Sequence, residues 1–184
     1  MEDNTQELAL QLDECVANGE NQKALEIIDL LLENLPKKTE LNVIKAHIHN
    51  ELEEYEKAIE SCNIALKTLM TNPEVYFERG YAYDRLEKVE EAIKDYEDAI
   101  KLKTKDVFCY IGSAMRYIEK GEFEKAVKNL TKALEFNEED DHVYYQRAVA
   151  YAGLEQKEEA IADLNKAIEL NPAELYVQEL EKLK

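Results

Sequence analysis

Residues 73–106 read PEVYFERGYAYDRLEKVEEAIKDYEDAIKLKTKD, and this stretch predicts a pair of helices. In its first half, Tyr76, Gly80 and Tyr83 follow one another at steps of four and three residues, which places them on one face of a helix. The second half carries another apolar face at helical spacing, made of Val89, Ala92, Ile93, Tyr96, Ala99 and Ile100. The stretch therefore predicts a helix–turn–helix in which small residues lie where the two helices approach closely.

One alanine of this stretch has counterparts along almost the whole chain. Ala92 belongs to a series with a period of 34 residues, which consists of Ala24, Ala58, Ala92, Ala126 and Ala160. A second series follows seven residues later and consists of Ala65, Ala99, Ala133 and Ala167, with Leu31 in the first position. Fixed periods of roughly 20–50 residues are typical of repeat proteins, whose units bury their apolar faces against their neighbours. We therefore expect an all-α fold of five tandem repeats.

Local signals mark several predicted helix starts. Asn72-Pro73 and Asn171-Pro172 each combine a capping residue with a proline suited to the first helical position, so we expect a helix to begin at both. The acidic run at residues 138–141 lacks the glycine and the alternating spacing of a calcium-binding loop. Acidic residues at a helix start interact favourably with the helix dipole, which explains this run without a metal.

Composition limits the classes of function. Of the 184 residues, 45% are apolar and 35% charged, so the chain is expected to fold. The net charge of −18 argues against nucleic-acid or membrane binding, because nucleic acids and anionic lipids attract basic surfaces. The three cysteines form no Cys-x-x-Cys pair, and the sequence shows neither a signal peptide nor an apolar stretch long enough to span a bilayer. These features lead us to expect a cytoplasmic protein.

No residue set with the spacing of a catalytic centre or a metal site stands out. His47 and His49 are two residues apart and would point to different faces of a helix. By the repeat period, His49 replaces an aromatic core residue, which favours a structural role over metal binding. Neither Ser61 nor Ser113 lies in the context of a nucleophile. We therefore expect no enzymatic activity, no cofactor and no metal.

Two segments carry a motif that points to a known family. Tyr76-x-x-Arg79-Gly80-x-x-Tyr83 is followed by Ala92, Tyr96 and Ala99, and Tyr144-x-x-Arg147-Ala148-x-x-Tyr151 is followed by Ala160, Leu164, Ala167 and Pro172. This pattern resembles the tetratricopeptide repeat family. The resemblance implies a right-handed helical-repeat solenoid of five helix–turn–helix units with a C-terminal capping helix. It implies one domain over 1–184, with repeats at about 5–38, 39–72, 73–106, 107–140 and 141–172 and the capping helix at 173–184.

The chain departs from the family at the turn between paired helices, where glycine is usual. Gly19 and Gly121 fit the family pattern, and we expect them in these turns. Glu53, Glu87 and Glu155 take the same place in the other three repeats. The geometry of these three turns is therefore open at this point.

The resemblance also implies where a partner binds, because the first helix of each pair lines the concave side of the solenoid in this family. Projecting the family's groove positions onto this sequence places residues such as Asn50 and Glu78 in that groove. The residues expected to contact a peptide are Val43, His47, Phe77, Tyr81, Arg85, Phe108, Ile111, Met115, Tyr145 and Val149. Most of them are apolar, and they either form an exposed binding stripe or are covered by neighbouring repeats or a terminal segment.

The family's carboxylate clamp is not matched by this sequence. It holds the C-terminal carboxylate of a chaperone with Lys, Asn and Arg side chains, and in the frame that starts at the second repeat these positions are occupied by Val43, His47, Glu78, Phe108 and Gly112. The arginines at positions 79, 116 and 147 are instead expected to pair with acidic side chains of the chain itself.

The predicted function is a scaffold or adaptor that binds a protein or peptide partner through an apolar or amphipathic segment. A groove of this kind suits a partner helix or an extended peptide. Two alternatives remain: an acidic neutraliser or chaperone of a basic protein, and a self-assembling scaffold in which residues 173–184 dock into another copy to form a homo-oligomer. The first predicts binding that weakens steeply with salt, because long-range charge attraction is screened.

Overall fold

The computed structural model describes residues 2–184, and these residues form an all-α structure. In the described part of the chain the helices are α1 (Glu2–Ala17), α2 (Asn21–Asn34), α3 (Leu41–Glu51), α4 (Tyr55–Ala65), α5 (Pro73–Arg85), α6 (Val89–Lys101), α7 (Val107–Glu119), α8 (Phe123–Leu134), α9 (Asp141–Gly153), α10 (Lys157–Leu170) and α11 (Glu174–Leu183). The chain therefore has the helical-repeat fold class that the sequence predicts.

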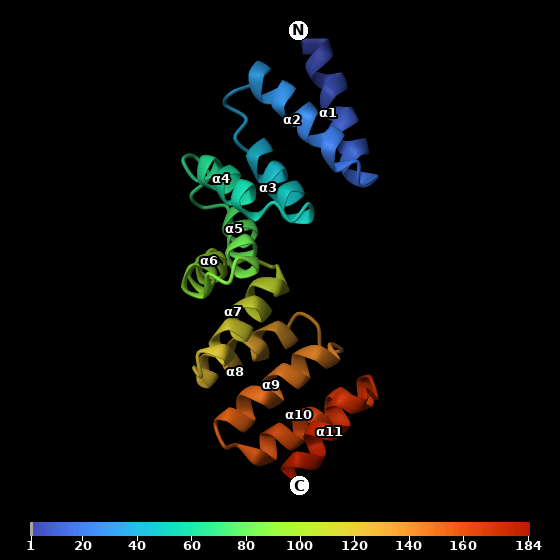
Figure 1. Ribbon diagram of the computed structural model, residues 1–184, viewed down its shortest axis with the longest axis vertical. Coiled ribbons are helices and arrows are strands. Elements are labelled where there is room, and N and C mark those ends of the chain that lie inside the picture. Colours follow the sequence, from blue (N-terminus) through green and yellow to red (C-terminus); the bar gives the residue numbers. More distant parts are fainter. Residues whose placement is uncertain (1) are drawn as a thin grey trace. The chain divides into compact units, whose positions relative to one another are not determined.

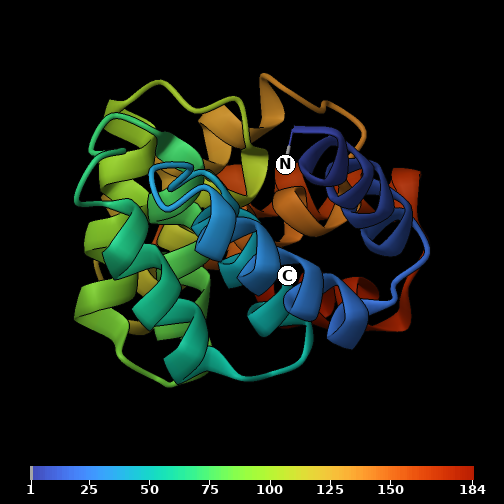
Figure 2. The same cartoon turned by 90° about the horizontal axis from the view of Figure 1, so that it is seen from above.

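The structure divides into two compact units, one up to Asp95 and one from Tyr96 to Lys184. In the N-terminal unit, α1 packs on α2, α3 on α4, and α5 on both α3 and α4 (Figure 1). In the C-terminal unit, α7 packs on α8 and α9 on α10, and α11 packs on α10 (Figures 1 and 2). The single domain over 1–184 stays a prediction, and Met1 lies outside the described residues.

The periodic alanines lie in the core. All five members of the first series, from Ala24 to Ala160, have no exposed surface. The second series is buried as well, with at most 2% exposure. Larger side chains such as Ile28, Leu130 and Leu164 fill the space beside them. A methyl group is all that fits between closely approaching helices, since overpacking displaces neighbouring side chains.

The turn between the helices of each pair has the same geometry in all five repeats. The backbone is left-handed at Gly19 and Gly121, with φ of 68° and 72°. It is also left-handed at Glu53, Glu87 and Glu155, with φ of 57–59°. In each turn the next amide donates to a carbonyl five residues earlier, as from Lys88 to Tyr83 at 2.9 Å. These are Schellman motifs, and three of them hold a glutamate in a conformation that favours glycine.

Replacing Glu87 with glycine is therefore expected to stabilise the N-terminal unit by about 0.5–1 kcal/mol. A side chain in the left-handed region is strained, and this relief exceeds the entropy that glycine adds to the unfolded chain. Urea unfolding followed by circular dichroism measures the change. Glu60→Gly, at an exposed position in the middle of α4, is the control and should lose about 1 kcal/mol. A destabilised Glu87→Gly variant would contradict the strain argument.

The predicted helix starts are confirmed in two places and wrong in one. The Asn72 side chain accepts from the Glu74 amide at 2.9 Å, and Asp140, within the acidic run, accepts from Val143 at 3.1 Å. At residues 171–172 no helix begins: α11 starts later, after Ala173, without a side-chain cap. Asn171 is instead the C-cap of α10, and its side-chain amide donates to Asp141 Oδ2 at 3.0 Å.

Candidate functional site

The ten residues predicted to contact a partner lie on the first helices of four repeats. Those on α3 and α5 belong to the N-terminal unit, and those on α7 and α9 belong to the C-terminal unit. Each unit therefore carries its own part of the predicted surface, and we describe the two parts separately.

In the N-terminal unit, four of the five predicted residues reach the surface. His47, Tyr81 and Arg85 are exposed and Phe77 is half-buried. Val43 differs, because only 4% of it is exposed and it packs in a core cluster with Ala46, Cys62, Ala65 and Val75. Val43 is therefore corrected from a groove residue to a core residue.

A pocket lies between α3 and α5 at the place where the predicted residues converge. Its volume is about 190 Å³, and it is lined by His47, Asn50, Glu51, Phe77, Glu78 and Tyr81. Three of these six belong to the predicted site. Tyr81 is held at the pocket by Tyr55, whose ring lies edge-on to it at a centroid distance of 6.5 Å. Arg85 stands beside this pair, and its Nε donates to Tyr55 Oη at 3.2 Å.

A buried polar cluster forms the floor of this pocket. Glu78 is 5% exposed, and its Oε1 lies 3.0 Å from His47 Nδ1. Asn50, also 5% exposed, donates from Nδ2 to Glu78 Oε2 at 2.7 Å and to the Glu78 carbonyl at 2.9 Å. The Asn50 Oδ1 atom is buried without a hydrogen-bond partner, which costs about 1–3 kcal/mol. The hydrogen bond to Glu78 raises the pKa of His47 above 6.5, although burial opposes the shift.

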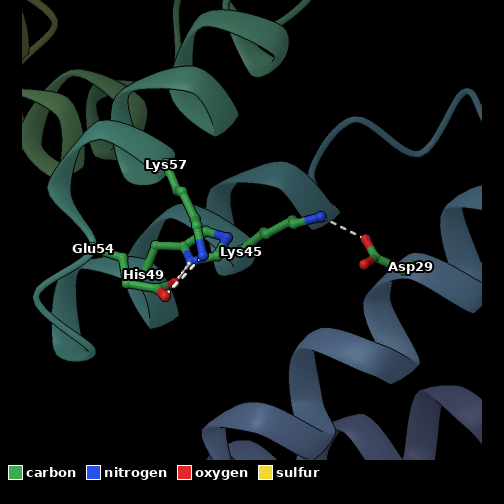
Figure 3. A network of polar contacts seen from close by, with 5 residues as sticks. All are labelled: Asp29, Lys45, His49, Glu54 and Lys57. Carbon is green, nitrogen blue, oxygen red and sulfur yellow. Dashed lines mark hydrogen bonds and ion pairs between the residues drawn. The ribbon is translucent and has the colours of Figure 1, made fainter.

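The other histidine of α3 belongs to a separate network in the same unit. His49 Nδ1 lies 2.7 Å from Glu54 Oε2, and Lys57 donates to the other oxygen at 2.8 Å. The hydrogen bond from Lys57 and, to a smaller extent, the one with His49 lower the pKa of Glu54. Figure 3 shows His49 and Lys57 converging on Glu54, while Lys45 reaches from α3 to Asp29 on α2. His49 is 5% exposed, so it lies at the core position that the repeat period predicts for it.

In the C-terminal unit, the predicted residues divide into an exposed and a covered group. Phe108, near the start of α7, is 63% exposed, and Ile111 and Met115 on the same helix are half-buried. Tyr145 on α9 stacks against Tyr176 of α11, with ring centroids 5.0 Å apart. A cavity of about 110 Å³ remains there, lined by Tyr145, Ala148, Val149, Ala152, Leu164, Glu179 and Leu183. The C-terminal helix therefore covers part of the stripe, one of the two arrangements left open by the sequence.

The arginines pair with acidic residues of the chain, as predicted. Arg147 donates from Nε and Nη2 to the two oxygens of Asp163 at 2.7 and 2.8 Å. Arg79 makes the same bidentate contact with Asp95 at the same two distances. Each arginine also donates from Nη1 to the residue 16 positions earlier, Asn63 or Thr131. These arginines join neighbouring repeats.

The described residues show no further reactive group. In this part of the chain no three His, Cys, Asp or Glu side chains are grouped as a metal site. The three cysteines are buried, and burial raises the pKa of Cys62 to about 12. None of the described helices combines the length and apolar character needed to cross a membrane.

The family pattern places Asn50 and Glu78 at groove positions, but neither was predicted to contact a partner. Glu51 was not predicted to lie in the groove at all. The selection favoured apolar side chains, so the polar floor of the pocket was overlooked. A signal was present in the sequence, since a glutamate and an asparagine at groove positions of adjacent repeats are close enough to interact.

Comparison with known proteins identifies the repeat. The sequence pattern described as "Tetratricopeptide repeat" matches residues 73–106 and 143–173, and that described as "TPR repeat" matches residues 115–155. No curated protein sequence matches the chain.

Several solved structures have the same fold. A crystal structure of MamA is 23% identical with a TM-score of 0.81, and the match covers 94% of each chain. YrrB, described as a TPR protein with an unusual peptide-binding site, is 22% identical with a TM-score of 0.79, over 93% of this chain and 88% of YrrB. A tetratricopeptide repeat protein from Parabacteroides merdae is 19% identical with a TM-score of 0.80, over 97% of this chain and 72% of its own. At these identities the similarity establishes the fold.

Proposed function

The chain belongs to the tetratricopeptide repeat family, and from this we propose that it is a protein–protein interaction scaffold whose first-helix faces bind a peptide or a partner helix. Members of the family are generally interaction scaffolds without enzymatic activity. In the N-terminal unit the proposed binding surface lies on α3 and α5, and in the C-terminal unit it lies on α7.

The observation that carries this proposal is the exposure of large aromatic side chains at the groove positions. Phe108 is 63% exposed and Tyr81 is 36% exposed, although each of their helices also carries fully buried apolar residues such as Val75 and Ala114. Aromatic side chains are enriched among the residues that dominate binding energy at interfaces. YrrB is described as binding a peptide, and its similar fold supports the same kind of ligand here.

We expect Tyr81→Ala combined with Met115→Ala to weaken partner binding by about 2 kcal/mol, or roughly 30-fold, because truncating an aromatic anchor removes its buried contact. Partners captured by the wild-type protein are identified by mass spectrometry, and the affinity of each purified partner is measured by calorimetry. Met70→Ala is the control, since Met70 is 65% exposed but lies outside the groove. Equal affinity of the wild type and the double variant would exclude this groove.

A second candidate is a neutraliser or chaperone of a basic protein, favoured by the net charge of −18. The two functions differ in their response to salt. Binding through overall charge weakens strongly between low and high ionic strength, because exposed charges are screened. Binding through the aromatic groove depends less steeply on ionic strength, because its apolar contacts are not screened.

A further inference from the structure

The pocket between α3 and α5 has a chemistry opposite to that of a carboxylate-binding site. Its polar lining consists of two glutamates, one asparagine and one histidine, and it contains no Lys or Arg. The acidic side chains are held on two helices of one compact unit, so their spacing is fixed by the packing of α3 on α5. The pocket therefore offers hydrogen-bond acceptors to an incoming group.

The Glu78 carboxylate lacks a permanent positive partner. Its side chain is 6% exposed, and its contacts in the described structure are His47 and Asn50. Asn50 is neutral, and His47, whose Nε2 also lies 3.4 Å from Glu51 Oε1, carries a charge only when protonated. Even then it supplies one positive charge for two carboxylates. Buried carboxylates are normally paired with a cation, because removing them from water is costly. A positive group entering the pocket would supply the missing charge.

Asn50 provides a second, independent indication of a ligand. Its two side-chain hydrogen bonds in the described structure use the amide nitrogen, and its Oδ1 atom is buried without a donor. Buried acceptors in folded proteins are nearly always satisfied. A ligand with several N–H groups could donate to Asn50 and to Glu78 at the same time.

The aromatic side chains of the pocket favour a flat cation. Phe77 and Tyr81 lie beside the acidic floor, and Tyr81 keeps 36% of its surface exposed. Guanidinium groups stack on aromatic rings and present five donors in a fixed plane. The same unit shows this contact nearby, where the Arg85 guanidinium lies 5.8 Å from the centre of the Tyr55 ring.

We propose that the α3–α5 pocket binds the guanidinium group of an arginine side chain presented by the partner. Glu78, Glu51 and Asn50 accept its hydrogen bonds, and Phe77 and Tyr81 contact its flat faces. This proposal rests on the proposed function, because it places one residue of the partner in the groove. The overall charge of −18 would favour the approach of such a basic segment.

The test uses N-acetyl-arginine amide as the probe and its citrulline analogue as a matched control of nearly the same shape without the charge. Binding to the full chain is followed by NMR at low salt. We expect the arginine probe to shift the signals of α3 and α5, including the Asn50 side-chain amide, and the citrulline probe to bind about tenfold more weakly or not at all, since a hydrogen bond to a charged group is stronger than a neutral one. Equal binding of the two probes, or shifts located elsewhere, would overturn the proposal.

Glu78→Gln tests the same contact from the side of the protein. It keeps the size of the side chain, and we expect about a tenfold loss of affinity for the arginine probe. Glu56→Gln removes the same charge from an exposed position on α4 and should leave the affinity unchanged. If Glu78→Gln fails to fold, the arginine and citrulline comparison on the wild type still decides.

The two proposals can fail separately. If the arginine probe does not bind while partner binding still depends on Tyr81 and Met115, only the arginine inference is wrong. If those two substitutions leave partner binding unchanged, the proposed groove is wrong, whether or not the arginine probe binds.

Discussion

Replacing Arg147 with methionine should lower the free energy of unfolding of the C-terminal unit by about 3–5 kcal/mol, because a buried carboxylate then loses the arginine that pairs with it. The side chains of Arg147 and Asp163 are 16% and 9% exposed, and two short hydrogen bonds join them. The guanidinium also lies between the rings of Tyr144 and Tyr151, at 5.5 and 5.9 Å from their centres. Methionine keeps most of the aliphatic contact but leaves Asp163 uncompensated.

Urea unfolding of the single and double variants separates the ion pair from packing. Arg147→Met combined with Asp163→Leu should recover most of the lost stability, since removing both charges leaves no unpaired buried group. Lys166→Met is the control, because Lys166 pairs with Glu169 at 3.1 Å on the surface and should contribute less than about 1 kcal/mol. A double variant as unstable as Arg147→Met alone would show that the contact acts through packing and not through charge.

These arginines also show how far the sequence could be interpreted. That they pair with acidic residues was predictable, because a chain with 41 acidic and 23 basic residues offers many partners. Which residue pairs with which was not, since the partner lies on the other helix of the pair. The structure reveals a constant offset: Asp29, Asn63 and Thr131 each lie 16 residues before the basic residue that they contact. The offset follows from the repeat and could have been found by testing it at every repeat.

The groove could be predicted from the sequence only in part, because here too contacts between helices decide the outcome. The family frame located the exposed Tyr81 and Phe108, since both side chains lie on the solvent-exposed side of a regular helix. It did not detect that Val43 is buried, because burial depends on how α3 packs against α4 and α5. It also left the covering of Tyr145 by α11 open, since an amphipathic last helix is compatible with several positions. Contacts between helices, rather than patterns within them, decided these cases.

Gly153 shows the same dependence on packing between helices. A Cβ atom built on Gly153 would lie 2.5–2.6 Å from three atoms of the Phe123 ring. Two repeats earlier, Arg85 takes the place of Gly153 and Tyr55 that of Phe123, and the Arg85 guanidinium contacts the Tyr55 ring. In the C-terminal unit the ring instead packs directly on the backbone of α9, which requires glycine.

Gly153→Ala is therefore expected to destabilise the C-terminal unit by about 3 kcal/mol, at the upper end of the usual cost of overpacking, because the rigid ring has to move. Phe123→Ala should relieve the clash, so the double variant should lose clearly less stability than the two single variants added together. Gly121→Ala is the control. A Cβ atom built on Gly121 has nothing within 4 Å, but φ is 72°, so the stability that this variant loses comes from backbone strain. That loss should simply add to the loss caused by Phe123→Ala. Thermal and urea unfolding of six proteins measure these differences: the wild type, the three single variants, and the two double variants that combine Phe123→Ala with Gly153→Ala or with Gly121→Ala. Strict additivity for Gly153 and Phe123 would mean that the ring does not pack on the α9 backbone.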